Sequence, residues 1–169
     1  MNPQDLLRAQ YKQAHAMLEA VIDDCSAEAL NYVVPGSNVG SIGAIYAHAV
    51  FDEDGMVAGP TGGTTVYESG GFKDRSELAM PGPMQSQEWS QGTAIDVAAF
   101  REYAQAVYAA TDAFLANVSD DDLAAEVETF GGKQPLGEYL GTIALWHVTS
   151  HQGEISAVKG AQGLKGLPF

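Results

Sequence analysis

The sequence predicts an all-α fold, a four-helix bundle in which a long crossover loop joins the second and third helices. Three observations predict it. Apolar residues recur at the helical period in four segments, residues typical of helix starts precede these segments, and a stretch rich in glycine and proline separates the second from the third. The chain has 169 residues, of which 46% are hydrophobic. Because this length suits one domain with a sizeable core, we expect residues 1–169 to form a single domain.

The first helix is predicted over residues 4–24. Its apolar residues form one stripe, which consists of Leu7, Tyr11, Ala14, Leu18, Val21 and Ile22. His15 lies beside this stripe, either as a polar residue at the boundary of the core, which is the commoner case, or as a side chain that reaches a central site. Residues 26–30 are expected to form a short turn, and residues 31–38 an extended segment that ends in a turn.

The second helix is predicted to begin at Ser41, a good N-cap residue, and to end within residues 51–55. The helical spacing places His48 on the stripe that faces the core, and Asp52 follows one turn later. Asp52 is a candidate to bind a metal ion or to orient an imidazole ring. The alternative, which the run of three acids favours, is that residues 52–54 form a solvated acidic helix end.

Residues 56–92 carry many glycines and prolines, and the helical pattern fades there. A connection of this length inside a compact domain is often a binding loop or a lid. We expect an ordered crossover that packs on the bundle through its large side chains, Tyr67, Phe72, Met84 and Trp89.

The third helix has the clearest amphipathic pattern in the chain, formed by Val97, Phe100, Ala104, Val107, Tyr108, Thr111, Phe114, Leu115 and Val118. Thr93 and Asp96 resemble a capping box with aspartate in place of glutamate, which predicts the start of this helix. After the helix, Ser119 is expected to cap a further short turn.

The last helix is predicted over residues 135–159. Residues 126–129 before it are expected to be extended, and two glycines at 131–132 to turn the chain. Pro135 suits the first position of a helix, and Gly160 suits its end.

The last helix carries two histidines, His147 and His151, at a spacing of four residues. Side chains at this spacing lie on the same helix face, one turn apart, and neutral imidazoles are common ligands of zinc, nickel, copper and iron. Glu154 lies on the same stripe. The motif is not that of the zinc peptidases, because Val148 stands where their general-base glutamate would be. Two partly buried polar residues on an amphipathic helix are the alternative explanation.

The composition excludes several classes of function. The formal charge is −14, from 22 acidic and 8 basic residues, and no basic stripe offsets it, so we expect no nucleic-acid binding and no attraction to anionic lipid. No apolar run has the length of a membrane span, and the amino terminus does not resemble a signal peptide, so a cytoplasmic location is expected. The single cysteine, Cys25, excludes an intrachain disulfide and a cysteine-rich zinc site.

Nearly the whole chain resembles the DinB-like superfamily of bacterial helical bundles, also called the YfiT-like metal-dependent group. The resemblance rests on the segment 41–48, which ends in His48, on the run 147–155, and on the closing segment 163–168. In that family the metal site is a histidine triad, with one histidine on the second helix and two on the fourth. Here His48, His147 and His151 fill those three positions.

This resemblance implies a divalent metal ion as the cofactor, with zinc or nickel first and iron or manganese as alternatives. Three neutral imidazoles would leave coordination positions open, which is typical of catalytic rather than structural sites. The resemblance also implies pairing of two bundles, so we expect a homodimer.

The resemblance further implies an enzyme of the S-transferase type that acts on a small-molecule substrate with a low-molecular-weight thiol such as bacillithiol, mycothiol or glutathione. Glu154, Asp52 and then His15 are the candidates for orienting a metal ligand or transferring a proton. Two alternatives stay open, a metal-dependent hydrolase and a non-catalytic module for ligand binding or stress response.

Overall fold

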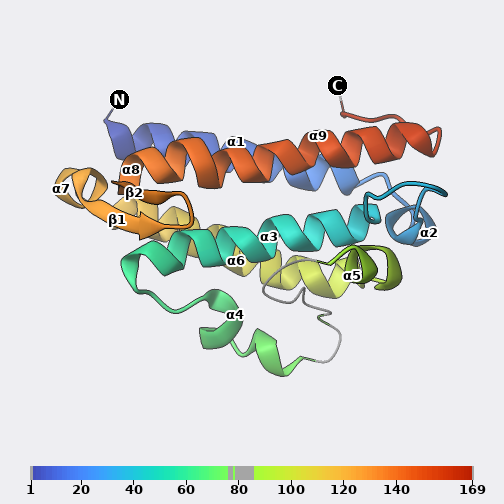
Figure 1. Ribbon diagram of the computed structural model, residues 1–169, viewed down its shortest axis with the longest axis horizontal. Coiled ribbons are helices and arrows are strands. Elements are labelled where there is room, and N and C mark those ends of the chain that lie inside the picture. The colour runs from blue at the N-terminus through green and yellow to red at the C-terminus, as the bar shows by residue number, and fades with distance from the viewer. Residues whose placement is uncertain (1, 76–77, 79–85, 169) are drawn as a thin grey trace.

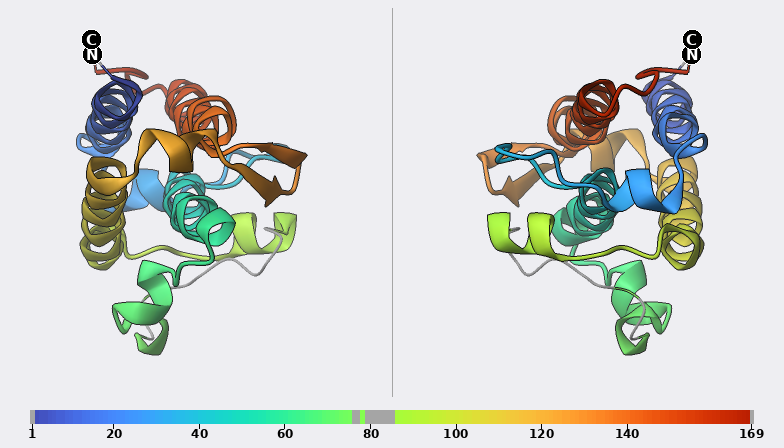
Figure 2. Two further views of the ribbon diagram at one scale, coloured as in Figure 1. Left: turned by 90° about the vertical axis from the view of Figure 1, so that its left-hand side faces the viewer. Right: turned by 90° about the vertical axis from the view of Figure 1, so that its right-hand side faces the viewer.

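The computed structural model of the chain describes residues 2–75, 78 and 86–168. Within these residues, four long helical stretches run alongside one another (Figure 1), and seen end-on they stand at the corners of a square (Figure 2). They are α1 (Pro3–Ile22), α3 (Ile42–Ala58), α6 (Val97–Asn117) and the final stretch that ends with α9 (Leu145–Ala161). Helices α1 and α3 each contact both α6 and α9. The predicted mainly helical fold is confirmed.

Helix α1 begins where its sequence indicates a start. The side chain of Asn2 accepts a hydrogen bond from the Asp5 backbone N–H at 2.7 Å, and Pro3 occupies the first turn. The predicted apolar stripe is buried against the neighbouring helices. Two polar side chains of α9 also reach it, because Gln152 donates to the carbonyl of Ala14 at 2.7 Å and Lys159 donates to that of Val21 at 2.7 Å. Helices α1 and α9 are therefore joined by apolar packing and by buried hydrogen bonds.

A short helix, α2 (Ala27–Asn31), follows with Ser26 as its N-cap and leads through an irregular segment to α3. Ser41 caps α3 as predicted, since its hydroxyl accepts a hydrogen bond from the Ala44 N–H. The helix continues to Ala58, three residues past the predicted range. The fading of the apolar pattern after residue 55 therefore does not mark the end of α3.

The prediction of a solvated acidic helix end at residues 52–54 is wrong. Glu53 is 0% exposed and Asp54 is 4% exposed. Asp54 accepts hydrogen bonds from the backbone N–H groups of Val66 and Tyr67, at 2.8 and 2.9 Å. Because these partners come from a distant part of the chain, local sequence cannot reveal them. Buried carboxylates are stable when their oxygens are hydrogen-bonded in this way.

The described residues of the segment between α3 and α6, where the crossover is predicted, include two short helices, α4 (Val66–Ser69) and α5 (Gln87–Gly92), and 3₁₀ turns at residues 59–61 and 72–74. Asp54 ties the start of α4 to α3, as described above. Three of the four large side chains expected to anchor the crossover, Tyr67, Phe72 and Trp89, pack on the core. Met84 lies outside the described residues. The expected packing of the crossover is confirmed for those three side chains.

The start of α6 differs from the prediction by one helical turn. Asp96, not Thr93, is the N-cap, and its carboxylate accepts a hydrogen bond from the Ala99 N–H. Thr93 instead follows the end of α5. Both residue types are common N-caps, and the predicted cap, Thr93, is wrong. The cap predicted at Ser119 is confirmed, because Ser119 and Asp122 form a reciprocal capping box at the start of α7 (Asp120–Ala124).

A small antiparallel hairpin, β1 (Glu126–Thr129) and β2 (Gly132–Pro135), precedes the last helix. The first strand was expected as an extended segment, whereas its pairing with a second strand was not. Gly132 has a φ of +97°, a conformation that favours glycine and allows the tight turn.

The last helix is not one uninterrupted α-helix. It starts as α8 (Leu136–Tyr139), passes through a π-helical turn at Leu140–Ala144, and continues as α9 to Ala161. Pro135 belongs to β2 and immediately precedes the helix instead of opening it. None of the helices in the described residues is both long enough and apolar enough to cross a bilayer.

Candidate metal centre

Three histidines converge between α3 and α9. His48 lies in the middle of α3, and His147 and His151 lie one turn apart on α9, the helix that packs along it. One nitrogen from each ring lies within 4.8 Å of the other two. Each side chain is half-buried. The structure therefore brings together the three residues that the sequence singles out.

Glu154 fixes the orientation of His151. Its carboxylate lies 2.7 Å from Nδ1 of His151, and this hydrogen bond holds the pKa of Glu154 below its usual value. A carboxylate only accepts hydrogen bonds, so Nδ1 carries a proton, and the tautomer of neutral imidazole that this contact favours presents a lone pair at Nε2. This is the arrangement by which proteins commonly prepare a histidine for a metal ion.

The lone pair of His151 points at a second imidazole. Nε2 of His151 and Nε2 of His147 are 3.2 Å apart. Two nitrogens bound to one tetrahedral zinc ion at 2.0–2.1 Å would be about 3.3 Å apart. The pair therefore has the spacing that one shared metal ion requires.

Burial favours the uncharged form of two of the three rings. Burial first, and then the neighbouring His151, lower the pKa of His48 and of His147 to about 4. These two rings are neutral at pH 7, and neutral imidazole is the form that binds metals. In addition, Nδ1 of His48 and Nδ1 of His147 are buried and have no hydrogen-bond partner among the described residues. A buried nitrogen without a partner is costly, and a ligand between the three rings could pair with Nδ1 of His48, whereas Nδ1 of His147 cannot bind the same ion as Nε2 of that ring. One nitrogen from each ring lies within 4.8 Å of the other two, so the donor set fits a metal ion.

Asp52 faces the triad from α3, one turn beyond His48. Its two carboxylate oxygens lie 3.6 Å from Nδ1 of His48 and 3.5 Å from Nε2 of His147, longer than hydrogen bonds. Burial raises the pKa of Asp52, although its side chain is still 31% exposed. Both carboxylates chosen from the sequence thus lie beside the histidines, Glu154 in a tight contact and Asp52 in a loose one.

His15 does not reach this centre. Its Nε2 lies 2.9 Å from both carboxylate oxygens of Glu53, and the Thr111 hydroxyl donates to the same carboxylate at 2.7 Å. Glu53 points away from the triad although it follows Asp52 directly in the sequence. A helix turns by about 100° per residue, so consecutive side chains lie on different faces. His15 is buried, so it is neither a boundary residue nor a part of the metal centre.

A pocket of about 300 Å³ opens beside His48, His151 and Glu154. Its other wall contains uncharged polar side chains that the sequence did not single out, Asn38, Gln87 and Ser90. Gly40 allows this wall to form, because a Cβ atom there would lie 2.7 Å from the Cβ of Ser90. A glycine before the Ser41 cap was the only signal of this close approach.

No lysine or arginine is among the described residues that line this pocket. Three cations in the second half of the chain, Arg101, Lys133 and Lys159, lie elsewhere. Arg101 pairs with Glu19 and Asp23. Lys159 is buried against α1, and Lys133 lies on the hairpin.

Comparison with known proteins supports the family resemblance. The sequence profile of the DinB superfamily matches residues 10–155. Among solved structures, the crystal structure of a conserved protein from Enterococcus faecalis is similar to this chain with a TM-score of 0.80 at 14% identity, covering 95% of this chain and 97% of that one. Identity this low shows a shared fold and no more. No curated protein matches the chain.

Proposed function

This chain belongs to the DinB superfamily, and we propose that it binds one divalent metal ion through His48, His147 and His151 and uses it to activate a small nucleophile. The observation that carries the proposal is the pair of Nε2 atoms of His147 and His151, 3.2 Å apart, with the lone pair of His151 set by Glu154. Imidazole ligands suit zinc and nickel first, with iron or manganese as alternatives.

We also infer that the four long helices constitute the four-helix bundle of this superfamily and that the segment between α3 and α6 is its crossover. The crossover contributes to the site, since Gln87 and Ser90 of α5 line the pocket beside the triad. A substrate in this pocket would touch the crossover on one side and the histidines on the other.

The residues around the triad have separate roles in this proposal. A bound divalent ion would lower the pKa of a coordinated thiol or water and so supply a nucleophile near neutral pH. Glu154 holds His151 in the tautomer that binds metal. Asp52 accepts a proton beside His48 and His147, because a carboxyl group with a raised pKa can exchange protons closer to neutral pH.

The first candidate reaction is transfer of a low-molecular-weight thiol to a small electrophile. The uncharged amide and hydroxyl groups of Asn38, Gln87 and Ser90 can hydrogen-bond the polar parts of such a thiol. Because no cation lines this part of the described chain, we expect a thiol rich in hydroxyl and amide groups to bind better than one with several carboxylates, such as glutathione.

The second candidate is metal-dependent hydrolysis, in which water replaces the thiol. One observation favours it: Asp52 lies beside the histidines, where it can take the proton of an attacking water. Activity that needs no thiol and disappears on chelation would distinguish hydrolysis from thiol transfer. A non-catalytic role is the third possibility, and it would be supported by ligand binding that survives replacement of the histidines.

The proposal is tested by metal analysis of protein produced without a histidine tag. We expect about one divalent ion per chain by mass spectrometry, and none in the double variant His147→Ala/His151→Ala. The matched control is His15→Gln, which removes the histidine outside the triad. If the parent protein neither contains zinc or nickel nor takes it up when offered, the proposed function is wrong.

Thiol transfer is then tested on the loaded protein with bacillithiol, mycothiol and glutathione and a panel of small electrophiles. Loss of activity in the double variant and in Asp52→Asn, with folding intact by circular dichroism, is the expected result. Activity that is equal with and without thiol would move hydrolysis ahead of transfer.

A further inference from the structure

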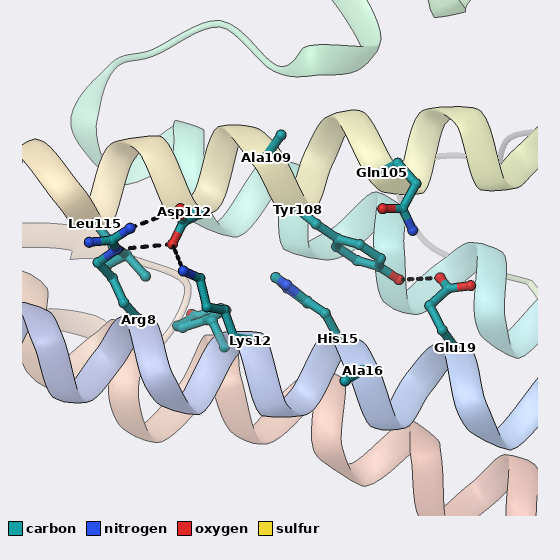
Figure 3. A pocket seen from close by; sticks show the side chains of 11 residues that line it. Arg8, Lys12, His15, Ala16, Glu19, Gln105, Tyr108, Ala109, Asp112 and Leu115 are labelled. Atoms are coloured by element: carbon teal, nitrogen blue, oxygen red, sulfur yellow. Dashed lines mark hydrogen bonds and ion pairs between the residues drawn. The ribbon is translucent and has the colours of Figure 1, made fainter.

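A second pocket, of about 360 Å³, lies between α1 and α6 (Figure 3). In the end-on view these two helices stand on one side of the square, and α3 and α9, which carry the triad, stand on the other (Figure 2). The pocket is therefore separate from the metal centre. Its volume is within the range of small-molecule sites.

The two carboxylates at the ends of this pocket are already satisfied. Asp112 accepts hydrogen bonds from two nitrogens of Arg8 at 2.9 and 3.0 Å, and Lys12 lies 3.3 Å away. Glu19 accepts the hydroxyl of Tyr108 at 2.9 Å, and Tyr46 and Arg101 occupy the rest of its carboxylate. Each carboxylate therefore already has three partner atoms within the chain.

Unused hydrogen-bond donors remain at the end of the pocket near Arg8 and Lys12. The ammonium group of Lys12 has three donors, its side chain is 61% exposed, and Asp112 is its one ion-pair partner among the described residues. Arg8 uses Nε and Nη2 on Asp112 and keeps Nη1. Asp112 and Asp5 both lie near Arg8, but the remaining donors of Lys12 and Arg8 can hold a negatively charged group at this end of the pocket.

His15 provides a second polar contact in the middle of the pocket, between Lys12 and Tyr108 (Figure 3). Its Nε2 is directed at Glu53, so Nδ1 is the ring nitrogen left for a ligand, and Nδ1 has no hydrogen-bond partner in the described part of the chain. A hydroxyl group can both donate and accept a hydrogen bond. It can therefore pair with Nδ1 whether or not that nitrogen carries a proton.

Aromatic rings, small side chains and the amide of Gln105 line the rest of the pocket. The rings of His15 and Tyr108 are stacked, with centroids 4.0 Å apart and an angle of 18° between their planes. Ala16 and Ala109 lie on the facing helices and leave room beside these rings. Such walls accept a planar ring more readily than a branched chain.

We propose that the pocket between α1 and α6 binds a small aromatic hydroxy acid. Its carboxylate is held by Lys12 and Arg8, its ring lies against Tyr108, and its hydroxyl pairs with Nδ1 of His15. Lys12 and His15 are three residues apart on α1, so their Cβ atoms lie about 5–6 Å apart, which one substituted ring spans. This inference does not depend on the metal centre.

The test is a titration of the chelator-treated full chain, labelled with ¹⁵N, with 4-hydroxybenzoate as the probe. Chelation removes the metal ion to which a carboxylate could otherwise bind. We expect amide shifts confined to residues 8–19 and 105–115, and a shift of the Nδ1 resonance of His15. Benzoate, which lacks the hydroxyl, and 4-hydroxybenzyl alcohol, which lacks the carboxylate, should each bind more weakly.

Two variants assign the contact. Lys12→Gln should weaken binding of 4-hydroxybenzoate about tenfold, because a charge-assisted hydrogen bond is lost. Lys133→Gln, which removes a lysine from the distant hairpin, should leave the affinity unchanged. The inference is overturned if no shifts occur at millimolar probe, if they fall outside α1 and α6, if Lys12→Gln binds as the parent does, or if the three probes bind equally. His15 and Glu53 would then only tie α1 to α3.

Discussion

Two clusters of histidine and carboxylate flank α3, and they use similar residues in opposite ways. On one face, Glu53 is fully buried and accepts close hydrogen bonds from His15 and Thr111. On the other, Asp52 is 31% exposed and stands 3.5–3.6 Å from His48 and His147 without a hydrogen bond. In the first cluster Nε2 of His15 is paired with a carboxylate of the chain, whereas in the second the carboxylate and the two histidines are not hydrogen-bonded to each other.

The difference shows how to separate a structural polar cluster from a binding site. Residue type does not separate them, because both clusters contain an imidazole beside a carboxylate. Buried nitrogens without hydrogen-bond partners are a better guide: of the three in the described residues, two are Nδ1 atoms of the triad, and the third, Nε of Arg101, lies 3.1 Å from Glu19 in an ion pair. A chain that leaves such atoms unpaired gains stability when a ligand binds them.

The largest expected effect comes from removing Glu53. Glu53→Ala would leave His15 and Thr111 without their partner in a dry environment, and breaking such a pair costs about 3–5 kcal/mol of the free energy of unfolding. The matched variant Asp52→Ala should change that free energy by less than about 1 kcal/mol. Urea denaturation of chelated protein measures both. Equal losses in the two variants would remove the distinction between the clusters.

The metal itself should have the next largest effect. A metal ion that binds only the folded chain, supplied at 100 times its dissociation constant, adds about 2.7 kcal/mol to the free energy of unfolding. We expect this increment in the parent and its loss in His48→Ala, measured by urea denaturation with and without zinc. An increment that survives His48→Ala would place the metal somewhere else.

Glu154→Gln should reduce zinc affinity without abolishing it. The variant weakens the contact that sets the tautomer of His151, and loss of such a partner costs roughly 10- to 100-fold in metal affinity. Isothermal titration calorimetry gives the dissociation constants. Glu88→Gln, on the exposed face of α5, is the control and should bind zinc as the parent does. If both variants behave alike, Glu154 does not orient the ligand.

The smallest effect is expected at Thr111. Thr111→Val removes one of the hydrogen bonds to Glu53 and leaves His15 in place, so the free energy of unfolding should fall by about 1 kcal/mol. Zinc affinity should not change, since Thr111 lies on the far side of α3 from the triad. A weaker zinc affinity in this variant would show that the two clusters are coupled through the helix.

The sequence predicted the features that depend on residues close together in the chain, such as helix caps and the face of a helix on which a side chain lies. The spacing of His147 and His151, the position of His48 behind the Ser41 cap, and the apolar stripes of α1 and α6 all follow from helical geometry. The match to a known family then placed the three histidines at one site. That expectation of their proximity is confirmed.

What the sequence could not predict depends on contacts between distant residues. Glu53 and Asp54 were predicted to be solvent-exposed because their hydrogen-bond partners lie from 12 to 58 residues away in the sequence. The pocket wall formed by Gln87 and Ser90 also depends on contacts between distant residues, because α5 lies far from the histidines in the sequence. The choice of Thr93 over Asp96 as a cap is different, because two good caps within one turn give the same local signal.

The π-helical turn at Leu140–Ala144, between α8 and α9, has a consequence for how the last helix can gain or lose a residue among related proteins. A π-helical turn holds one residue more than an α-helical turn, so the segments on either side keep the phase of a continuous helix that is one residue shorter. A relative that lacks one residue here would still direct its two histidines toward α3. Relatives that differ by one residue at this turn can therefore keep both histidines on the helix face that is directed toward α3. A one-residue alignment gap at this point would not indicate loss of the site.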